Sequence, residues 1–255
     1  MIQPLQIRNL ALAGHSSSGK TTIFEALLHA AGLTHSPGSI ERGNTVSDYE
    51  SMEIQYGHSM QTSLASIEKP DLRINLIDTP GYPDFRGPTL SALRVVETVA
   101  IVVDASHGIE YGTRQMMHYA SERNLARVLV VNHIDADDLD LPALINDLRE
   151  ELGSECLPVQ LPAQGGTQIL DTFFHHEGHT DFDHLADAHQ RILDQVVEIN
   201  ERIMGRYLDQ GEGALSRKDL HNAFEQCLRE GHLVPICFMS ASTGTGVAQF
   251  LDLAE

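Results

Sequence analysis

The chain has 255 residues, of which 17 are basic and 36 acidic, giving a formal net charge of −19. Contacts to nucleic-acid phosphates need lysine and arginine, so this charge argues against direct DNA binding. Three cysteines without a C-x-x-C spacing do not indicate a disulfide framework or a zinc site, and they favour a reducing, cytoplasmic compartment. No stretch approaches the ~18 consecutive apolar residues of a membrane span, and no signal-peptide pattern opens the chain, so we expect no membrane partner.

Apolar runs alternate with longer amphipathic stretches along most of the chain. The expected strands are residues 7–13, 72–77, 99–103, 127–131 and 234–239. The expected helices are residues 20–31, 111–123, 141–152 and 247–253. Strands that alternate with helices predict an α/β fold, with a mainly parallel sheet and helices on both faces. In such sheets the ligands bind at the carboxyl ends of the strands.

The alternation stops between about residues 157 and 232. Apolar residues that step by threes and fours over 185–207 predict one long amphipathic helix. A second helix is expected over 216–229, because Ser216 and Asp219 form a variant of the capping box. We interpret residues 157–232 as an α-rich subdomain inserted before the last strand.

A histidine-rich run lies at the start of this block and includes His175, His176 and His179. One interpretation is a zinc site. Histidines without tetrahedral spacing or cysteines more often belong to a solvated loop, which we favour here.

The first expected strand leads into a glycine-rich segment that fits G-x4-G-K-[ST]. It reads Gly14-His15-Ser16-Ser17-Ser18-Gly19-Lys20-Thr21, and Thr22 follows it in the helix. Glycines let the backbone wrap around a phosphate, and the amides at the start of the next helix attract the anion. Lys20 is expected to reach the β- and γ-phosphates, and Thr21 to ligate magnesium. The segment predicts a P-loop NTPase.

A second motif, Asp78-Thr79-Pro80-Gly81, follows the strand expected over 72–77. A carboxylate at a strand end can hold magnesium, and the Gly81 amide can meet the γ-phosphate without a side chain in the way. A plain Pro-Gly turn is the alternative. The position behind a phosphate loop favours the functional interpretation.

Two further strand ends carry residues suited to a guanine base. Asn132-His133-Ile134-Asp135 follows the strand over 127–131, and Ser240-Ala241-Ser242 follows the strand over 234–239. The Asp135 carboxylate can accept two hydrogen bonds from guanine N1 and its exocyclic amine, whereas adenine would leave these acceptors unpaired. Asn132 is expected to brace the loop, and amides of residues 240–242 to donate to guanine O6. The alternatives are an acidic loop and an ordinary polar turn.

These motifs together resemble the G domain of translational GTPases, specifically of elongation factor G and elongation-factor-G-like paralogues. Residues 43–59 (switch I) read GNTVSDYESMEIQYGHS and are similar to the family's G-T-A-T-M-D-W-M-E-Q-E-Q-E-R-G-I-T. Residues 78–85 (switch II) read DTPGYPDF and are similar to D-T-P-G-H-V-D-F. The resemblance covers residues 5–152 well and 190–254 fairly.

The resemblance implies that residues 1–255 form a G domain with a G′-like insert. It implies binding of GTP and GDP with Mg²⁺, whose ligands would be Thr21, Ser59 and Asp78. Hydrolysis of the γ-phosphate would involve Lys20, Gly81 and Tyr82. The ribosome is the implied partner, partly through domains that this chain lacks, and we expect the isolated G domain to be monomeric.

Four positions depart from the family. Ser59 replaces the switch I threonine, His133 replaces the lysine that packs over the base, and Ser17 replaces an aspartate of the phosphate loop. Tyr82 replaces the histidine that orients the attacking water, and a phenol cannot become a cation near neutral pH. The chain is therefore either a GTP hydrolase or a GTP-binding switch with little hydrolysis. A third, weaker interpretation is an ATP-using phosphoryl transferase.

Overall fold

The computed structural model of the protein describes residues 6–173 and 178–254. Within these residues the main sheet has seven strands in the order β2-β3-β1-β4-β5-β9-β6. They are β1 (Ile7–Gly14), β2 (Ser63–Lys69), β3 (Leu72–Asp78), β4 (Thr98–Asp104), β5 (Ala126–Asn132), β6 (Cys156–Pro158) and β9 (Val234–Phe238). All neighbours pair in parallel except β2 and β3, which are antiparallel. The expected α/β fold is confirmed.

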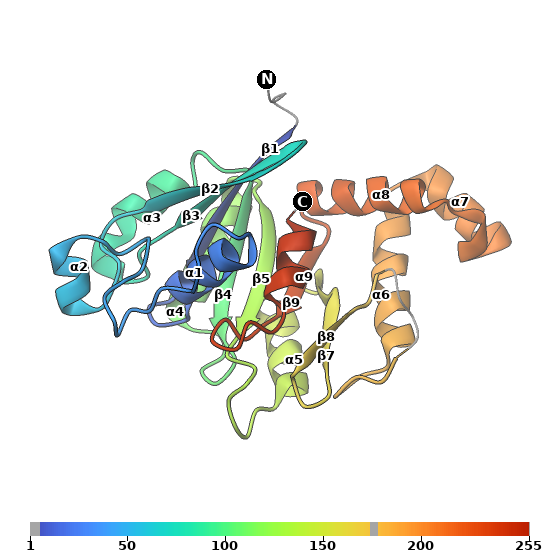
Figure 1. Cartoon of the computed structure of the whole chain (residues 1–255). Coiled ribbons are helices and arrows are strands. Elements are labelled where there is room, and N and C mark those ends of the chain that lie inside the picture. The colour runs from blue at the N-terminus through green and yellow to red at the C-terminus, as the bar shows by residue number, and fades with distance from the viewer. Residues whose placement is uncertain (1–5, 174–177, 255) are drawn as a thin grey trace.

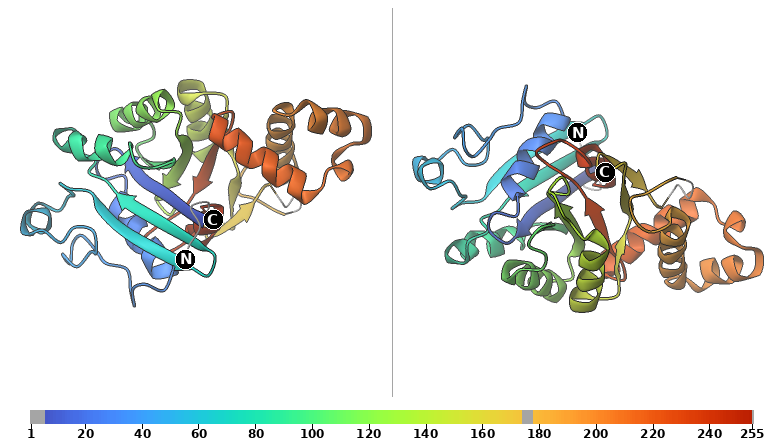
Figure 2. Two further views of the ribbon diagram at one scale, coloured as in Figure 1. Left: turned by 90° about the horizontal axis from the view of Figure 1, so that it is seen from above. Right: turned by 90° about the horizontal axis from the view of Figure 1, so that it is seen from below.

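Helices cover both faces of this sheet (Figures 1 and 2). They are α1 (Lys20–Ala30), α3 (Arg86–Ala92), α4 (Tyr111–Glu122), α5 (Leu141–Leu152) and α9 (Val247–Leu253). The short helix α2 (Ser51–Tyr56) lies to the side of the sheet (Figure 1). Successive residues of β1 face two different cores. Leu10 and Leu12 pack in the core that contains α1 and α9, whereas Ala11 and Ala13 pack in the core that contains α4 and α5. This alternation follows from the period of two in a strand. A strand buried on both faces reads as a continuous apolar run, which is why the central strands are predictable.

The segment between β6 and β9 adds a β-hairpin and three helices that project to one side of the sheet (Figure 1). They are β7 (Gln160–Ala163), β8 (Gln168–Asp171), α6 (Leu185–Glu198), α7 (Glu201–Gln210) and α8 (Arg217–Glu230). Ser216 caps α8, because its hydroxyl accepts a hydrogen bond from the Asp219 amide at 3.1 Å. Apolar side chains of α6 and α8 join the core that α1 and α9 share.

The single helix expected over 185–207 is wrong, because the chain forms two helices there. Asn200 lies between them in an extended conformation, and its side chain accepts hydrogen bonds from the amides of Arg202 (3.0 Å) and Ile203 (3.2 Å). Asparagine is a strongly preferred N-cap residue, so a new helix, α7, begins directly after Asn200. The apolar spacing continues across this break and therefore hides it.

Two strands of the main sheet are not expected from the sequence. β2 is an edge strand with a mixed burial pattern, and β6 has only three residues. β6 pairs with β9 at the far edge of the main sheet, with Cys156 opposite Val234. Residues 157 and 158, which the sequence places in the insert, therefore belong to the sheet.

Among the described residues, no helix combines the length and apolarity needed to cross a bilayer. Cys156, Cys227 and Cys237 are buried free thiols. Met116 and Met117 are 5% exposed and pack in the core beneath α4.

Candidate functional site

Four loops meet at one edge of the sheet because β1, β3, β5 and β9 all end there. These strands end at Gly14, Asp78, Asn132 and Phe238. The strands run parallel, so their carboxyl ends lie side by side. The four segments singled out at strand ends, residues 14–21, 78–81, 132–135 and 240–242, therefore converge on this edge.

The segment 14–19 wraps around the side chain of Lys20. Gly14 and Gly19 both have positive φ angles, of 142° and 94°. A Cβ on Gly14 would lie 2.5 Å from the Val102 carbonyl oxygen, and one on Gly19 would lie 2.1 Å from the Asn132 side-chain nitrogen. Only glycine fits at these two positions. The loop is closed by the Ser18 hydroxyl, which donates to the His15 carbonyl at 3.0 Å.

The Lys20 ammonium is buried at the start of α1 and donates a hydrogen bond to the His15 carbonyl. Burial lowers the pKa of Lys20 to about 8, although the carboxylates of Asp78, Glu110 and Asp48 oppose that shift. A buried cation that lacks full compensation attracts an anion. The arrangement suits phosphate groups seated on the loop.

Three oxygen groups gather beside this lysine. The Thr21 hydroxyl donates to the Asp78 carboxylate at 2.7 Å and lies 3.2 Å from the Ser59 hydroxyl. The second carboxylate oxygen of Asp78 is buried and has no hydrogen-bond partner among the described residues. Burial raises the pKa of Asp78 to about 7, against the Thr21 hydrogen bond and the Lys20 charge. Oxygen donors with an unfilled buried acceptor fit Mg²⁺, which prefers such ligands.

The structure describes only part of the histidine-rich run. His175 and His176 lie outside the described residues. Within residues 6–173 and 178–254, the His, Cys, Asp and Glu side chains form no group of three or more suited to a metal ion.

Switch II passes directly over Lys20. A Cβ on Gly81 would lie 2.5 Å from the Lys20 ammonium and 2.8 Å from the His15 carbonyl oxygen. The absence of a side chain therefore lets the Gly81 backbone approach the place where phosphates would sit. The next residue, Tyr82, is 40% exposed and packs against His58 of switch I with 4.5 Å between the ring centroids.

The fully buried Asn132 side chain joins two of the loops. Its nitrogen donates to the Ser18 carbonyl at 3.1 Å, and its oxygen accepts from the Ala241 amide at 3.1 Å. The phosphate loop and the loop after β9 are therefore fixed relative to each other by one side chain.

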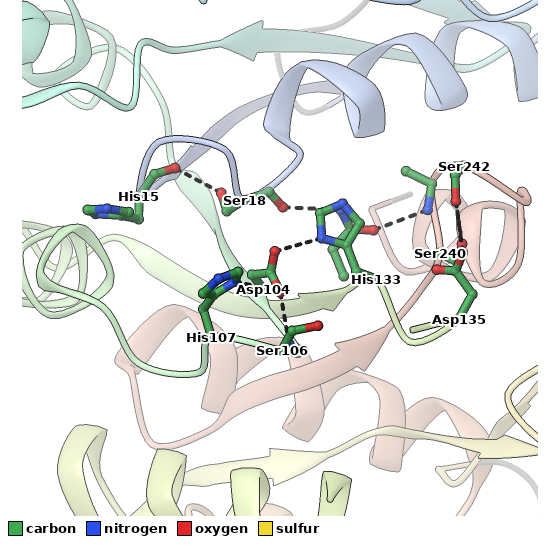
Figure 3. Close-up of polar contacts among 11 residues, drawn as sticks. His15, Ser18, Asp104, Ser106, His107, His133, Asp135, Ser240 and Ser242 are labelled. Atoms are coloured by element: carbon green, nitrogen blue, oxygen red, sulfur yellow. Dashed lines mark hydrogen bonds and ion pairs between the residues drawn. The ribbon is translucent and has the colours of Figure 1, made fainter. Parts of the chain in front are cut away.

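Asp135 lies next to the same β9 loop (Figure 3). Its carboxylate accepts from the Ser242 hydroxyl at 3.1 Å, and the hydroxyls of Ser240 and Ser242 are 2.9 Å apart. Partial burial would raise the pKa of Asp135, but hydrogen bonds from Ser240 and Ser242 outweigh it and lower that pKa. The ionised carboxylate offers two acceptors to a base.

Comparison with known proteins identifies the family of this chain. The model of the family described as elongation factor Tu GTP binding domain matches residues 5–255. The chain belongs to this family of translational GTPases.

Similar proteins include elongation factors and tetracycline resistance proteins. This GTP-binding domain is 29% identical to the elongation factor G-like protein of Mycobacterium tuberculosis, over 98% of the chain and 37% of that protein. It is 29% identical to the tetracycline resistance protein TetW of Butyrivibrio fibrisolvens, over 97% of the chain and 36% of that protein. The crystal structure of ttk003000868 from Thermus thermophilus aligns with a TM-score of 0.88 at 31% identity, covering 97% of this chain and 39% of the other. The chain therefore spans less than two fifths of these relatives.

One contact in the GTP-binding domain is missed at the sequence level. His133 has a positive φ of 62°, and its Nδ1 donates to the Asp104 carboxylate at 2.8 Å (Figure 3). The Ser106 amide donates to the same carboxylate at 2.8 Å. Burial opposes ionisation of Asp104, but these hydrogen bonds outweigh it and lower its pKa. The sequence offers one indication of this contact, because Asp104 places a carboxylate directly after the strand expected over 99–103.

The second missed residue is Glu25 of α1, which anchors the approach to switch I. Its carboxylate is 1% exposed. It accepts hydrogen bonds from the amides of Val46 (2.6 Å) and Gly38 (3.0 Å), and a longer one from Ser47 (3.4 Å). The sequence does not predict this anchoring contact of Glu25, because its partners lie in a loop that carries no recognisable motif.

We expect Glu25→Gln to loosen residues 38–47 without unfolding the domain. The substitution removes the charge and turns one acceptor oxygen into a donor, and a charge-assisted hydrogen bond is worth about 1.5–3 kcal/mol. Hydrogen exchange of the amides of Val46 and Gly38 should accelerate about tenfold or more. Glu150→Gln, on an exposed position of α5, is the matched control. Unchanged protection at both amides would contradict the anchoring function.

Proposed function

We propose that the chain is the GTP-binding and GTP-hydrolysing domain of an elongation-factor-G-like translation factor, and that its switches respond to the state of the γ-phosphate. The observation that carries this proposal is the Asn132 side chain, which ties the Lys20 loop to the Asp135–Ser242 pair. A triphosphate on one loop and a guanine base against the other would fill one continuous site.

In this proposal each group has a separate task. Gly14, His15, Ser16, Ser17, Ser18 and Gly19 surround the phosphates, with Thr22 in the first turn of α1. Lys20 neutralises charge that develops on the γ-phosphate, which is the main requirement of phosphoryl transfer. Thr21, Ser59 and Asp78 would hold Mg²⁺, and the ion would stabilise charge on the β- and γ-phosphates. The Gly81 amide positions the γ-phosphate.

The base is selected at the other end of the site. The Asp135 carboxylate accepts from guanine N1 and its exocyclic amine, Asn132 and His133 border the base, and amides of Ser240, Ala241 and Ser242 face guanine O6. ATP lacks the matching donors, which disfavours a phosphoryl transferase that uses ATP.

We further propose that the whole of residues 1–255 is one G domain, and that the segment between β6 and β9 is its G′-like insert. The ribosome is the proposed partner, in the cytoplasm, and the isolated domain is proposed to be monomeric. Support comes from switch I, where large apolar side chains are exposed rather than buried. They are Val46, Tyr49, Met52, Ile54 and Tyr56. Large apolar side chains left exposed in one segment are consistent with contact to a partner.

A GTP-binding switch with little hydrolysis is the second candidate. Tyr82 and Ser17 favour it, because neither supplies the group that the family has at these positions. GTP turnover measured with and without ribosomes distinguishes the two candidates. Turnover above a Lys20→Ala control, raised by ribosomes, supports the hydrolase. Tight GTP binding with turnover equal to that control under both conditions supports the switch.

Base selection provides a separate expected result. Asp135→Asn should weaken GTP and GDP binding about 100-fold, because an amide nitrogen would face the donors of guanine and leave them unpaired, at about 3 kcal/mol. Xanthosine nucleotides, which carry a carbonyl in place of the amine, should bind the variant more tightly than they bind the original chain. Competition binding measures both effects. Asp137→Asn, two residues further along the same exposed loop, is the control. Equal GTP affinity in Asp135→Asn would exclude this base site.

A further inference from the structure

His58 is the last switch I residue before Ser59, and aromatic rings surround it. Its ring centroid is 4.5 Å from that of Tyr82, 5.7 Å from that of Phe85 and 6.2 Å from that of Tyr56. Tyr82 and Phe85 belong to switch II. His58 is therefore a direct contact between the two switches.

The Nδ1 atom of His58 is buried and has no hydrogen-bond partner among the described residues. Such an atom is uncommon, because an unpaired buried polar group costs free energy comparable to a lost hydrogen bond. Asp48 lies close enough for an electrostatic interaction with the His58 ring, and the other titratable groups in contact with it are the phenols of Tyr56 and Tyr82. None of these contacts gives Nδ1 a hydrogen bond, so this buried nitrogen keeps its hydrogen-bonding capacity unfilled, and a water reaches it only when the rings around it move apart.

The neighbours of His58 and Tyr82 locate this ring pair relative to the phosphates. Ser59, which follows His58, lies 3.2 Å from the Thr21 hydroxyl. Gly81, which precedes Tyr82, lies against the Lys20 ammonium. His58 and Tyr82 are thus each next in the chain to a residue that would contact Mg²⁺ or the γ-phosphate.

Only one of the two rings has the chemistry that orients a nucleophile. A neutral imidazole offers an unprotonated nitrogen that accepts a hydrogen bond from water, whereas a phenol donates one more readily than it accepts. In the family sequence an isoleucine stands at the His58 position and the histidine at the Tyr82 position. In this chain the imidazole stands in switch I, and the aromatic partner stands in switch II.

We propose that His58 supplies the imidazole that orients the attacking water, while Tyr82 holds its ring in place. This inference rests on the proposed GTPase function. The water oxygen bonds to the γ-phosphorus, and the bond from that phosphorus to the β–γ bridging oxygen breaks. GDP leaves with the bridging electron pair, and the water proton ends on the released phosphate. His58 accepts a hydrogen bond from the water and keeps no proton.

Single-turnover GTP hydrolysis by the chain, with GTP affinity measured in parallel, tests the proposal. We expect His58→Ile to slow hydrolysis tenfold or more while the Kd for GTP changes less than threefold. The double variant His58→Ile, Tyr82→His, which moves the imidazole to switch II, should recover at least a third of the original rate. His118→Ile, on an exposed position of α4, is the matched control for loss of a histidine.

The outcomes separate this proposal from the function on which it rests. Hydrolysis by His58→Ile within twofold of the original chain would overturn the assignment of His58. If His58→Ile no longer binds GDP, His58→Phe, which keeps an aromatic ring at this position but has no nitrogen that accepts a hydrogen bond, replaces it in the same comparison. Failure of the double variant to exceed His58→Ile would show a packing effect and would also overturn the proposal. Hydrolysis by the original chain equal to that of Lys20→Ala would instead reject the GTPase function.

Discussion

Lys20→Met should abolish tight GTP binding while leaving the nucleotide-free domain folded. The ammonium is buried against the His15 carbonyl and lies next to the backbone of Gly81. Truncating one partner of a buried charge pair costs about 2–5 kcal/mol, so we expect GTP affinity to fall about 30-fold or more. Isothermal titration with GTP and GDP measures the loss.

Although GTP affinity falls, the free energy of unfolding of nucleotide-free Lys20→Met should rise slightly or stay unchanged. Burial lowers the pKa of Lys20 to about 8, so the folded protein disfavours this charge when phosphates are absent. Methionine keeps an unbranched apolar stem without the charge, and replacing a buried ion by an apolar group is often neutral or stabilising. We expect the free energy of unfolding, measured by thermal denaturation, to lie within about 1 kcal/mol of that of the original chain.

Lys218→Met on the exposed surface of α8 controls for the loss of one positive charge. GTP binding by Lys20→Met within tenfold of the original chain would mean that the loop does not hold the phosphates. A large loss of stability with a proportionate loss of binding would mean that Lys20 is mainly structural.

The elements that the sequence predicts well are those whose burial leaves a simple pattern. β4 is buried at six of its seven positions, and its apolar run predicts the strand within one residue at each end. β2 has only one fully buried residue, and its pairing with β3 depends on the chain reversing at residues 70–71. β2 forms a strand because it pairs with β3, and the residues of β2 alone carry no pattern that predicts this pairing.

The helix break at Asn200 shows a different limit. Val196 and Ile203 both pack against the same core, so the apolar spacing runs on through the cap. The capping residue is visible in the sequence, but a single asparagine within an amphipathic pattern does not outweigh the periodicity.

At the site, motifs locate the loops but do not give the contacts between them. The strand-end positions of Gly14, Asp78 and Asn132 follow from parallel topology, and the sequence is sufficient for them. The contacts of His133 with Asp104, of Glu25 with Val46, and of His58 with Tyr82 join segments far apart in the chain. None of these pairs belongs to one motif, and only the folded structure brings them together.

Asn132→Ala should weaken binding of GTP and GDP equally, which distinguishes it from changes at the γ-phosphate end. The side chain is fully buried and makes its two hydrogen bonds to backbone groups of two different loops. Alanine leaves the Ser18 carbonyl and the Ala241 amide unpaired, and each costs about 1–3 kcal/mol. The free energy of unfolding should therefore fall by roughly 2–6 kcal/mol, measured by urea denaturation.

The effect on binding follows from the geometry rather than from a lost contact to nucleotide. A ligand that bridges the two loops requires both to be held in their bound positions, and ordering them on binding subtracts from affinity. We expect the Kd for GDP to rise about 30-fold or more, from roughly 2 kcal/mol of lost preorganisation. Asn146→Ala, on an exposed position of α5, should leave both stability and affinity unchanged. Full GDP affinity in Asn132→Ala would show that the two loops do not form one site, and the guanine nucleotide assignment would then lose its structural support.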